Sequence, residues 1–420
     1  MAVTKTSLPD RHRMASSALG RLLLMIGTRG LDQLALGAAS LLIARRTGTE
    51  GFAPFAAIFI LYALTAQIGD RGLGFAILRT PSNTTLAAGA RSQRNLLNAV
   101  VALLSTAVGL RVGGDVGIVV AIAGLALFTG SIVFVGRAAL QWSGHTRRLS
   151  MGEGAGAVVF LLATVVLVRD ADDLLLFGMI CVGKHLIEMA VQGWPSLVFH
   201  PDGSTVRASG VWASQIVTYL AANVDYLLVG ALLGEVALSI YAIGFRLASA
   251  FSSVVAAPLT RTWFVDFANS ERLQEQHDRL LRQIAVFGVL GIAGTFVVAA
   301  ALPTVLGPGW EQTRSVTAVL GVALPWRLLL GPVVALGLTK GRARRVVGWE
   351  VVRAVGLVAA IVAGSSSVLN VAGAVAAATI LTIGWSYRRA VMGAGIEPSR
   401  ILEVLGLVAS ALLVLTLVVA

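Results

Sequence analysis

The chain has 420 residues, of which 56% are hydrophobic and only 13% are charged, so it cannot cover its surface as a soluble protein of this length would. Its formal net charge of +12 does not indicate nucleic acid binding, because the basic residues recur at intervals along the whole chain. The single cysteine, Cys181, excludes a disulfide framework, and no Cys/His cluster in the sequence suggests a metal site or a cofactor.

Apolar stretches of membrane-spanning length follow one another from end to end. A spanning helix needs about 20 mostly apolar residues. The chain therefore has room for about 12–14 transmembrane helices and for no separate soluble domain, which predicts an all-α polytopic membrane protein. Thirteen spans give the best count: 18–44, 52–69, 95–110, 116–135, 151–168, 174–198, 209–232, 237–260, 284–305, 315–338, 346–363, 367–386 and 401–420.

The basic residues give these spans an orientation. Lys and Arg number 22 in the N-terminal tail and the gaps after even-numbered spans, and 5 in the gaps after odd-numbered spans. Cytoplasmic loops carry the excess of Lys and Arg. We therefore expect a multi-pass protein of a bacterial cytoplasmic membrane with its N-terminus in the cytoplasm.

Two segments of similar pattern stand 186 residues apart. Residues 41–56 read LLIARRTGTEGFAPFA, and residues 227–242 read LLVGALLGEVALSIYA. In each, a span ends at a glycine, Gly48 or Gly234, and an aromatic residue, Phe55 or Tyr241, follows seven positions later. Six spans separate the two glycines, and an even number preserves orientation. The pattern predicts two lobes related by a parallel repeat.

The same two hairpins resemble a known family, the polysaccharide biosynthesis flippases. The superfamily of these flippases also holds the MATE multidrug exporters and the lipid II flippases. The first hairpin, 39–79, ends in Asp70-Arg71-Gly72-Leu73-Gly74, which is similar to the family's "Asp-x-Gly-Leu" ending. The second, 223–248, is similar to the start of the family's second lobe at Asp225, Gly230, Gly234, Tyr241 and Arg246.

This resemblance implies a MATE-like arrangement of two lobes. We expect an N-terminal lobe at 1–200, a cytoplasmic linker at 201–207, and a C-terminal lobe at 208–420 that carries one helix beyond its six. The implied substrate is a polyprenyl-phosphate-linked glycan, with the membrane lipids as surroundings and a glycan polymerase or ligase complex as a further partner. No nucleic acid is expected as a partner.

Ten charged residues, six basic and four acidic, lie three or more residues inside the ends of the predicted spans, where facing protein or a water-filled cavity costs less than facing lipid. Glu153 and Glu403 lie within two residues of the ends of their spans. Three sets share a helix face at three- or four-residue spacing and can pair locally: Arg29 with Asp32, Lys184 with Glu188, and Glu350 with Arg353. Arg21 lies near the cytoplasmic end, where its side chain can reach the interface.

Three further charges have no partner on their own helix. Asp225 and Arg246 flank the turn at Gly234 and could pair across the hairpin. Arg327 stands between Pro325 and Pro332, which predicts an interrupted helix that presents a cation to a cavity. An excess of basic residues suits an anionic substrate, and the forked donors of Arg suit phosphate. The predicted substrate-binding residues are Arg29, Asp32, Lys184, Asp225, Arg246, Arg327 and Arg353.

Four functions remain open at this point. The first is a flippase that moves a polyprenyl-(pyro)phosphate-linked oligosaccharide by alternating access. The second is a MATE-like ion-coupled exporter of small cations, against which the excess of basic residues counts. The third, a membrane glycosyltransferase or ligase, is disfavoured because the predicted outer loops are short, and the acids at 170–173 suit a helix start. The fourth is a scaffold. We expect no enzyme and no catalytic residues, and the sequence contains no ATP-binding P-loop motif.

Overall fold

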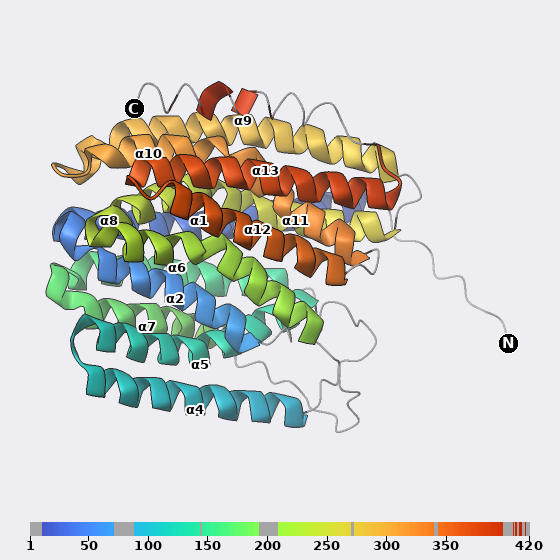
Figure 1. Ribbon diagram of the computed structural model, residues 1–420. Helices are drawn as coiled ribbons and strands as arrows, with labels where there is room; N and C mark the ends of the chain where they lie inside the picture. Colours follow the sequence, from blue (N-terminus) through green and yellow to red (C-terminus); the bar gives the residue numbers. More distant parts are fainter. Residues whose placement is uncertain are drawn as a thin grey trace.

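A computed structural model describes residues 11–70, 88–142, 145–192, 209–269, 273–339 and 343–397, together with a few residues between 406 and 416. Within these ranges the chain forms long helices that run side by side, joined by short turns (Figure 1). The all-α prediction is therefore confirmed.

The first half of the chain contributes six labelled helices and one short 3₁₀ turn, η1. They are α1 (Arg11–Gly51), α2 (Ala53–Asp70), α4 (Ala88–Val112), α5 (Gly114–Trp142), α6 (Thr146–Leu167), η1 (Ala171–Asp173) and α7 (Leu174–Gln192).

The second half contributes another six. They are α8 (Ser209–Asn269), α9 (Leu273–Leu306), α10 (Glu311–Val322), α11 (Leu324–Thr339), α12 (Ala343–Ala363) and α13 (Val368–Ala394).

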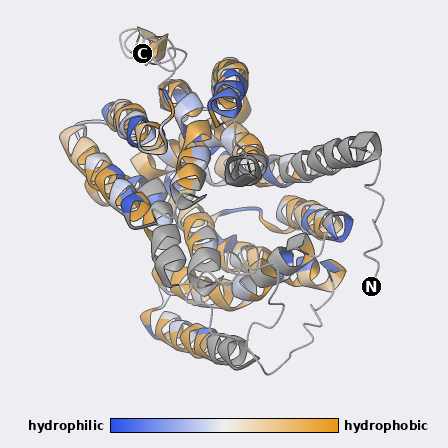
Figure 2. Cartoon of the chain, turned by 90° about the vertical axis from the view of Figure 1, so that its right-hand side faces the viewer, coloured by the Kyte–Doolittle hydropathy of each residue, from blue (hydrophilic) through white to orange (hydrophobic). Residues whose placement is uncertain are grey.

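These helices carry the first twelve of the thirteen predicted spans. By length and composition, seven of the described helical stretches can cross a membrane, or eight if the bent pair α10 and α11 is one span. Two shorter apolar stretches, Ala53–Tyr62 and Leu97–Val112, lie on the second and third predicted spans. Hydrophobic residues run along the helices in the view from the end of the bundle (Figure 2). The chain is thus a multi-pass membrane protein. The thirteenth span, 401–420, lies almost wholly outside the described residues.

The predicted repeat has a matching backbone geometry. Gly48 has φ 70° and ψ −177°, and Gly234 has φ 84° and ψ −176°. A residue with a Cβ seldom adopts this conformation, so glycine lets the chain break one helix and start the next within a single residue. The aromatic residues seven positions later, Phe55 and Tyr241, are both fully buried. The two hairpins therefore share a turn as well as a sequence pattern.

The helices of each half pack mainly on one another. In the first half, α5 contacts α2, α4 and α7, while α6 contacts α1 and α7. In the second half, α8 contacts α10, α11 and α12, and α13 contacts α10, α11 and α12. The halves meet where α8 packs on α1 and α2. The predicted linker, 201–207, lies outside the described residues, so the lobe boundaries stay a prediction.

Candidate functional site

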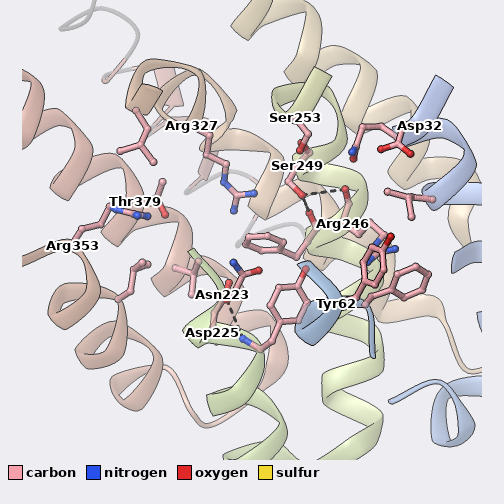
Figure 3. A pocket seen from close by; sticks show the side chains of 18 of the residues that line it. Asp32, Tyr62, Asn223, Asp225, Arg246, Ser249, Ser253, Arg327, Arg353 and Thr379 are labelled. Carbon is pink, nitrogen blue, oxygen red and sulfur yellow. Dashed lines mark hydrogen bonds between the residues drawn. The ribbon is translucent and has the colours of Figure 1, made fainter. Parts of the chain in front are cut away.

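A cavity of about 550 Å³ lies between the two halves. Its walls come from α1, α2, α5 and α7 of the first half and from α8, α11, α12 and α13 of the second. Figure 3 shows Arg327 and Arg353 on one side of it and Asp32 and Tyr62 on the other. Five basic and two acidic side chains line this space: Arg137, Lys184, Arg246, Arg327, Arg353, Asp32 and Asp225.

Three of the five cations are neutralised by acids. In the first half, the side chain of Glu188 is fully buried and bonds both Arg137 and Lys184, the latter at 2.9 Å. Lys184 also lies 2.9 Å from Asp32, and Arg137 lies 3.7 Å from Glu153. This network links α1, α5, α6 and α7. It confirms the predicted Lys184–Glu188 pair and extends it to three other helices.

The third neutralised cation belongs to α12. Arg353 donates to Glu350 at 2.9 Å from Nε and at 2.5 Å from Nη2, and both side chains are buried. The predicted pair is confirmed, so Glu350 neutralises much of the charge of Arg353 within the same helix. Arg29, the predicted partner of Asp32, lies on α1, but its side chain is outside the described residues.

The predicted pair of Asp225 and Arg246 is wrong. Asp225 instead accepts hydrogen bonds from the Tyr241 hydroxyl at 2.6 Å and from the backbone N–H of Tyr226 at 3.0 Å. Depth along the helix does not decide between the two partners. Counted from Gly234, Tyr241 differs from Asp225 by two residues and Arg246 by three, about 3 and 4.5 Å at 1.5 Å per residue. The direction of the side chains decides, since Tyr241 faces Asp225 and Arg246 faces the first half.

Arg246 reaches across to the first half instead. Its Nη1 donates to the hydroxyl of Ser40 on α1 at 2.6 Å, and its guanidinium lies 3.7 Å from the ring centre of Phe59 on α2. No acidic side chain pairs with it among the described residues. A cation held by a hydroxyl and an aromatic face keeps its positive charge uncompensated.

Arg327 is the second cavity cation that makes no ion pair among the described residues, although the charge of Asp225 acts on it from further away. The helix breaks at Ala323, two residues before Pro325, and α10 and α11 meet there at 43°. The predicted interruption is therefore present, and it places Arg327 in the first turn of α11. Its guanidinium lies 4.3 Å from the ring centre of Phe245, and its buried Nη1 has no hydrogen-bond partner among the described residues. A buried donor without a partner is costly, so it marks a place for an incoming acceptor.

Two features of the cavity were not predicted. Arg137 follows the fourth predicted span and was counted with a cytoplasmic loop, but α5 continues to Trp142 and carries it into the wall. Tyr62 stacks on His185 with ring centres 4.4 Å apart, and His185 Nδ1 lies 3.1 Å from the Thr129 hydroxyl. The position of Arg137 directly after an apolar run was the sequence feature that could have indicated its place in the wall. No spacing rule predicts that Tyr62 and His185 stack.

This geometry can be compared with known proteins. Residues 208–315, which contain Asp225 and Arg246, match the family model described as "Polysaccharide biosynthesis protein". This confirms the resemblance to the polysaccharide biosynthesis flippases. The teichuronic acid biosynthesis protein TuaB of Bacillus subtilis (strain 168) is 24% identical over 189 residues. The match spans 42% of this chain and 35% of TuaB, about a third of that relative's length.

Solved structures show that the chain has the MATE fold. It aligns with the lipid II flippase MurJ in an inward closed conformation at a TM-score of 0.67, with 8% identity, over 94% of this chain and 92% of MurJ. It aligns with an inward-facing multidrug resistance MATE transporter of the MOP superfamily at 0.65, with 13% identity, over 88% of this chain and 97% of that one. At these identities the likeness shows the fold alone, and the MATE-like prediction is confirmed.

Proposed function

We propose that the protein flips a polyprenyl-(pyro)phosphate-linked oligosaccharide across the membrane by alternating access. The family match and the transporter fold support a flippase or transporter role. The observation that supports a phosphate-bearing substrate is a pair of arginines, Arg246 and Arg327. Both line the cavity between the two halves, and neither makes an ion pair among the described residues. Arginine forks bind phosphate oxygens in pairs, and in a cavity of low dielectric such contacts are strong.

The rest of the cavity suits the sugar part of such a substrate. Aromatic rings from both halves line it, which offer flat apolar faces to sugar C–H groups, and hydroxyl and amide groups offer hydrogen bonds. The aromatic and polar residues concerned are Phe59, Tyr62, Phe134, Tyr226, Phe245, Asn223, Ser249 and Ser253. The names of TuaB and MurJ, a teichuronic acid biosynthesis protein and a lipid II flippase, point to the same kind of cargo.

Alternating access requires the halves to part at one end of the bundle. At the end that carries Gly48 and Gly234, Arg45 donates to the backbone oxygen of Val305 at 3.0 Å. Beside it the buried rings of Phe52 and Trp310 meet edge to face, with ring centres 6.1 Å apart. With the proposed cytoplasmic N-terminus, this end faces outward. Its contacts must break for the substrate to leave, after which a glycan polymerase or ligase would receive it.

The proposal includes no enzymatic step. The acids at 170–173 have a structural role, since Asp170 and Asp173 form a capping box at η1. Asp173 accepts from the backbone N–H of Arg169 at 2.7 Å, and Asp170 accepts from that of Asp172 at 3.1 Å. Carboxylates that accept hydrogen bonds from backbone N–H groups in a helix cap are held in place by those bonds and are poorly placed for catalysis.

The first experiment deletes the gene in its host and analyses the lipid extract by mass spectrometry for polyprenyl-linked sugars. We expect complete lipid-linked repeat units to accumulate, and their mass identifies the cargo. An unchanged lipid extract together with altered sensitivity to cationic drugs would replace the flippase by a MATE-like exporter.

The second experiment complements that deletion strain with variants. Arg327→Gln and Arg246→Gln should each insert normally and reduce flipping about tenfold or more, because each removes a charged hydrogen bond worth about 1.5–3 kcal/mol to the phosphate. Arg279→Gln is the matched control, since Arg279 is an exposed arginine on α9 outside the cavity. Normal flipping by the double variant Arg246→Gln/Arg327→Gln would remove these residues from the site.

A further inference from the structure

A second pocket lies at the ends of α12 and α13 and shares no lining residue with the central cavity. It measures about 510 Å³ and is lined by Arg345, Trp349, Trp385, Arg389, Met392 and Gly393. On α12, Arg345 precedes Trp349 by four residues, and on α13, Trp385 precedes Arg389 by four. Because four residues make about one turn, each helix presents one arginine and one tryptophan on a single face. The two helices run in opposite directions, so both arginines lie at the same end.

The charge of this pocket is wholly basic. None of its six lining residues is acidic, both arginines are exposed, and the Arg389 guanidinium lies 5.8 Å from the ring centre of Trp385. The arginines of the central cavity, in contrast, are buried or half-buried. Two exposed guanidinium groups, one of them beside a tryptophan ring, make a site for an anion that arrives from the membrane surface.

The pocket-lining faces of α12 and α13 become apolar with increasing distance from the helix ends that carry Arg345 and Arg389. On α13, Leu381 stands one turn beyond Trp385 on the same face and is 71% exposed. On α12, Val352 follows Trp349 by three residues and is 47% exposed. Moving away from the helix ends, the order is therefore basic, aromatic and apolar, each step about 6 Å or less at 1.5 Å per residue. A phospholipid presents phosphate, glycerol and acyl chains in the same order and on the same scale.

We propose that this pocket binds an anionic glycerophospholipid through its phosphate. Arg345 and Arg389 hold the phosphate between them, and Trp349 and Trp385 lie against the glycerol region, where tryptophan is favoured at membrane interfaces. Basic pockets between membrane helices are typical sites for anionic head groups. A free phosphate would use the arginines and would gain nothing from the exposed apolar face beneath them. The proposed orientation places this pocket at the cytoplasmic leaflet. The proposal of the site itself does not depend on that orientation.

Native mass spectrometry of the purified chain in detergent tests this site. The chain is mixed with phosphatidylglycerol, with phosphatidylcholine of the same acyl chains, with inorganic phosphate, and with polyprenyl phosphate. We expect phosphatidylglycerol to be retained in preference to phosphatidylcholine. The double variant Arg345→Gln/Arg389→Gln should retain it about tenfold less, since each surface arginine adds appreciably to the attraction of anionic lipid.

The control variant is Arg279→Gln/Arg388→Gln, which removes two exposed arginines outside the pocket and leaves the same net charge. Equal retention of phosphatidylglycerol by both double variants would overturn the proposal. Retention of inorganic phosphate as strong as that of the lipid would show a free-anion site, and displacement of phosphatidylglycerol by equimolar polyprenyl phosphate would assign the pocket to the carrier. Because the readout is binding in detergent, it is independent of whether the protein flips a glycan.

Discussion

The buried pair of Glu350 and Arg353 allows two roles of Arg353 to be separated. The pair should stabilise the fold, and the sequence also predicts that Arg353 binds substrate. In Arg353→Met the carboxylate of Glu350, 3% exposed, loses the charged partner that donates to it at 2.5 and 2.9 Å. Breaking a buried pair in this way costs about 3–5 kcal/mol. An unfolding entropy that scales with chain length converts this loss into a melting temperature about 3–6 °C lower for a chain of this size.

Removing both charges should restore most of that loss. A buried pair replaced on both sides is often neutral in stability, since the desolvation cost of each ion disappears with it. We therefore expect Glu350→Gln/Arg353→Met to melt near the unchanged protein. Arg327→Gln is the matched control, because it removes a cavity arginine without leaving an acid unpaired, and it should shift stability by less than about 1 kcal/mol.

The assay is the loss of monodisperse protein on heating in detergent, followed by size-exclusion chromatography. If Arg353→Met alone melts within a degree of the unchanged protein, the pair does not stabilise α12 and the reasoning fails. Under the proposed function, flipping by the double variant then decides the second role. Normal flipping would leave Arg353 a structural residue, and lost flipping in a stable double variant would keep it among the substrate contacts.

Three further predictions concern the turn at Gly234, the hydrogen bond between Tyr241 and Asp225, and the end of the bundle that carries Gly48 and Gly234. Gly234→Ala forces a Cβ into a glycine-only conformation and should cost about 1–3 kcal/mol in the melting assay, whereas Gly294→Ala, in open space within α9, should be neutral or stabilising. Tyr241→Phe removes the hydroxyl that donates to a buried aspartate at 2.6 Å and should cost about 1–3 kcal/mol; an unchanged melting temperature would contradict that bond. Under the proposed function, Thr49→Cys with Gly309→Cys, cross-linked by oxidation in a background without the native cysteine, should stop flipping until reduced, because a Cβ at 309 would lie 3.9 Å from the Thr49 side chain. Gly309→Cys alone is the control for backbone strain, since Gly309 has φ 86°. Flipping by the cross-linked protein would show that this end need not open.

Local features of the chain could be predicted from its sequence. The helices, the glycine turns and the break before Arg327 follow from hydropathy, from glycine spacing and from Pro325, all of which act within a few residues. Pairs within one helix, such as Glu350 with Arg353, also follow from spacing alone. These predictions held because the physics that decides them is short in range.

Contacts between helices could not be predicted in the same way. The bonds from Glu188 to Arg137 on α5 depend on how two helices are rotated about their axes, which no spacing rule gives. Arg137 itself was placed in a loop because the apolar run ended before it, although a cavity lets a helix continue past a charge. The partner of Arg246 was missed for a similar reason, since Ser40 lies 206 residues away on α1.

That contact bears on how substrate binding could move the two halves. Arg246 is a residue of the second half whose hydrogen bond and aromatic contact, to Ser40 and Phe59, both lie in the first half. Under the proposed function a phosphate that enters the cavity competes for the same guanidinium. A charged acceptor forms a stronger hydrogen bond than a hydroxyl does. The phosphate therefore replaces Ser40 as the acceptor of the Arg246 hydrogen bond, and the bond to α1 is lost. The Nη1 of Arg327 has no hydrogen-bond partner in the described part of the chain, so Arg327 breaks no hydrogen bond of that atom when it binds phosphate. The two arginines would then differ in role: Arg327 supplies affinity, while Arg246 exchanges an inter-half contact for substrate and so couples binding to the movement that alternating access requires.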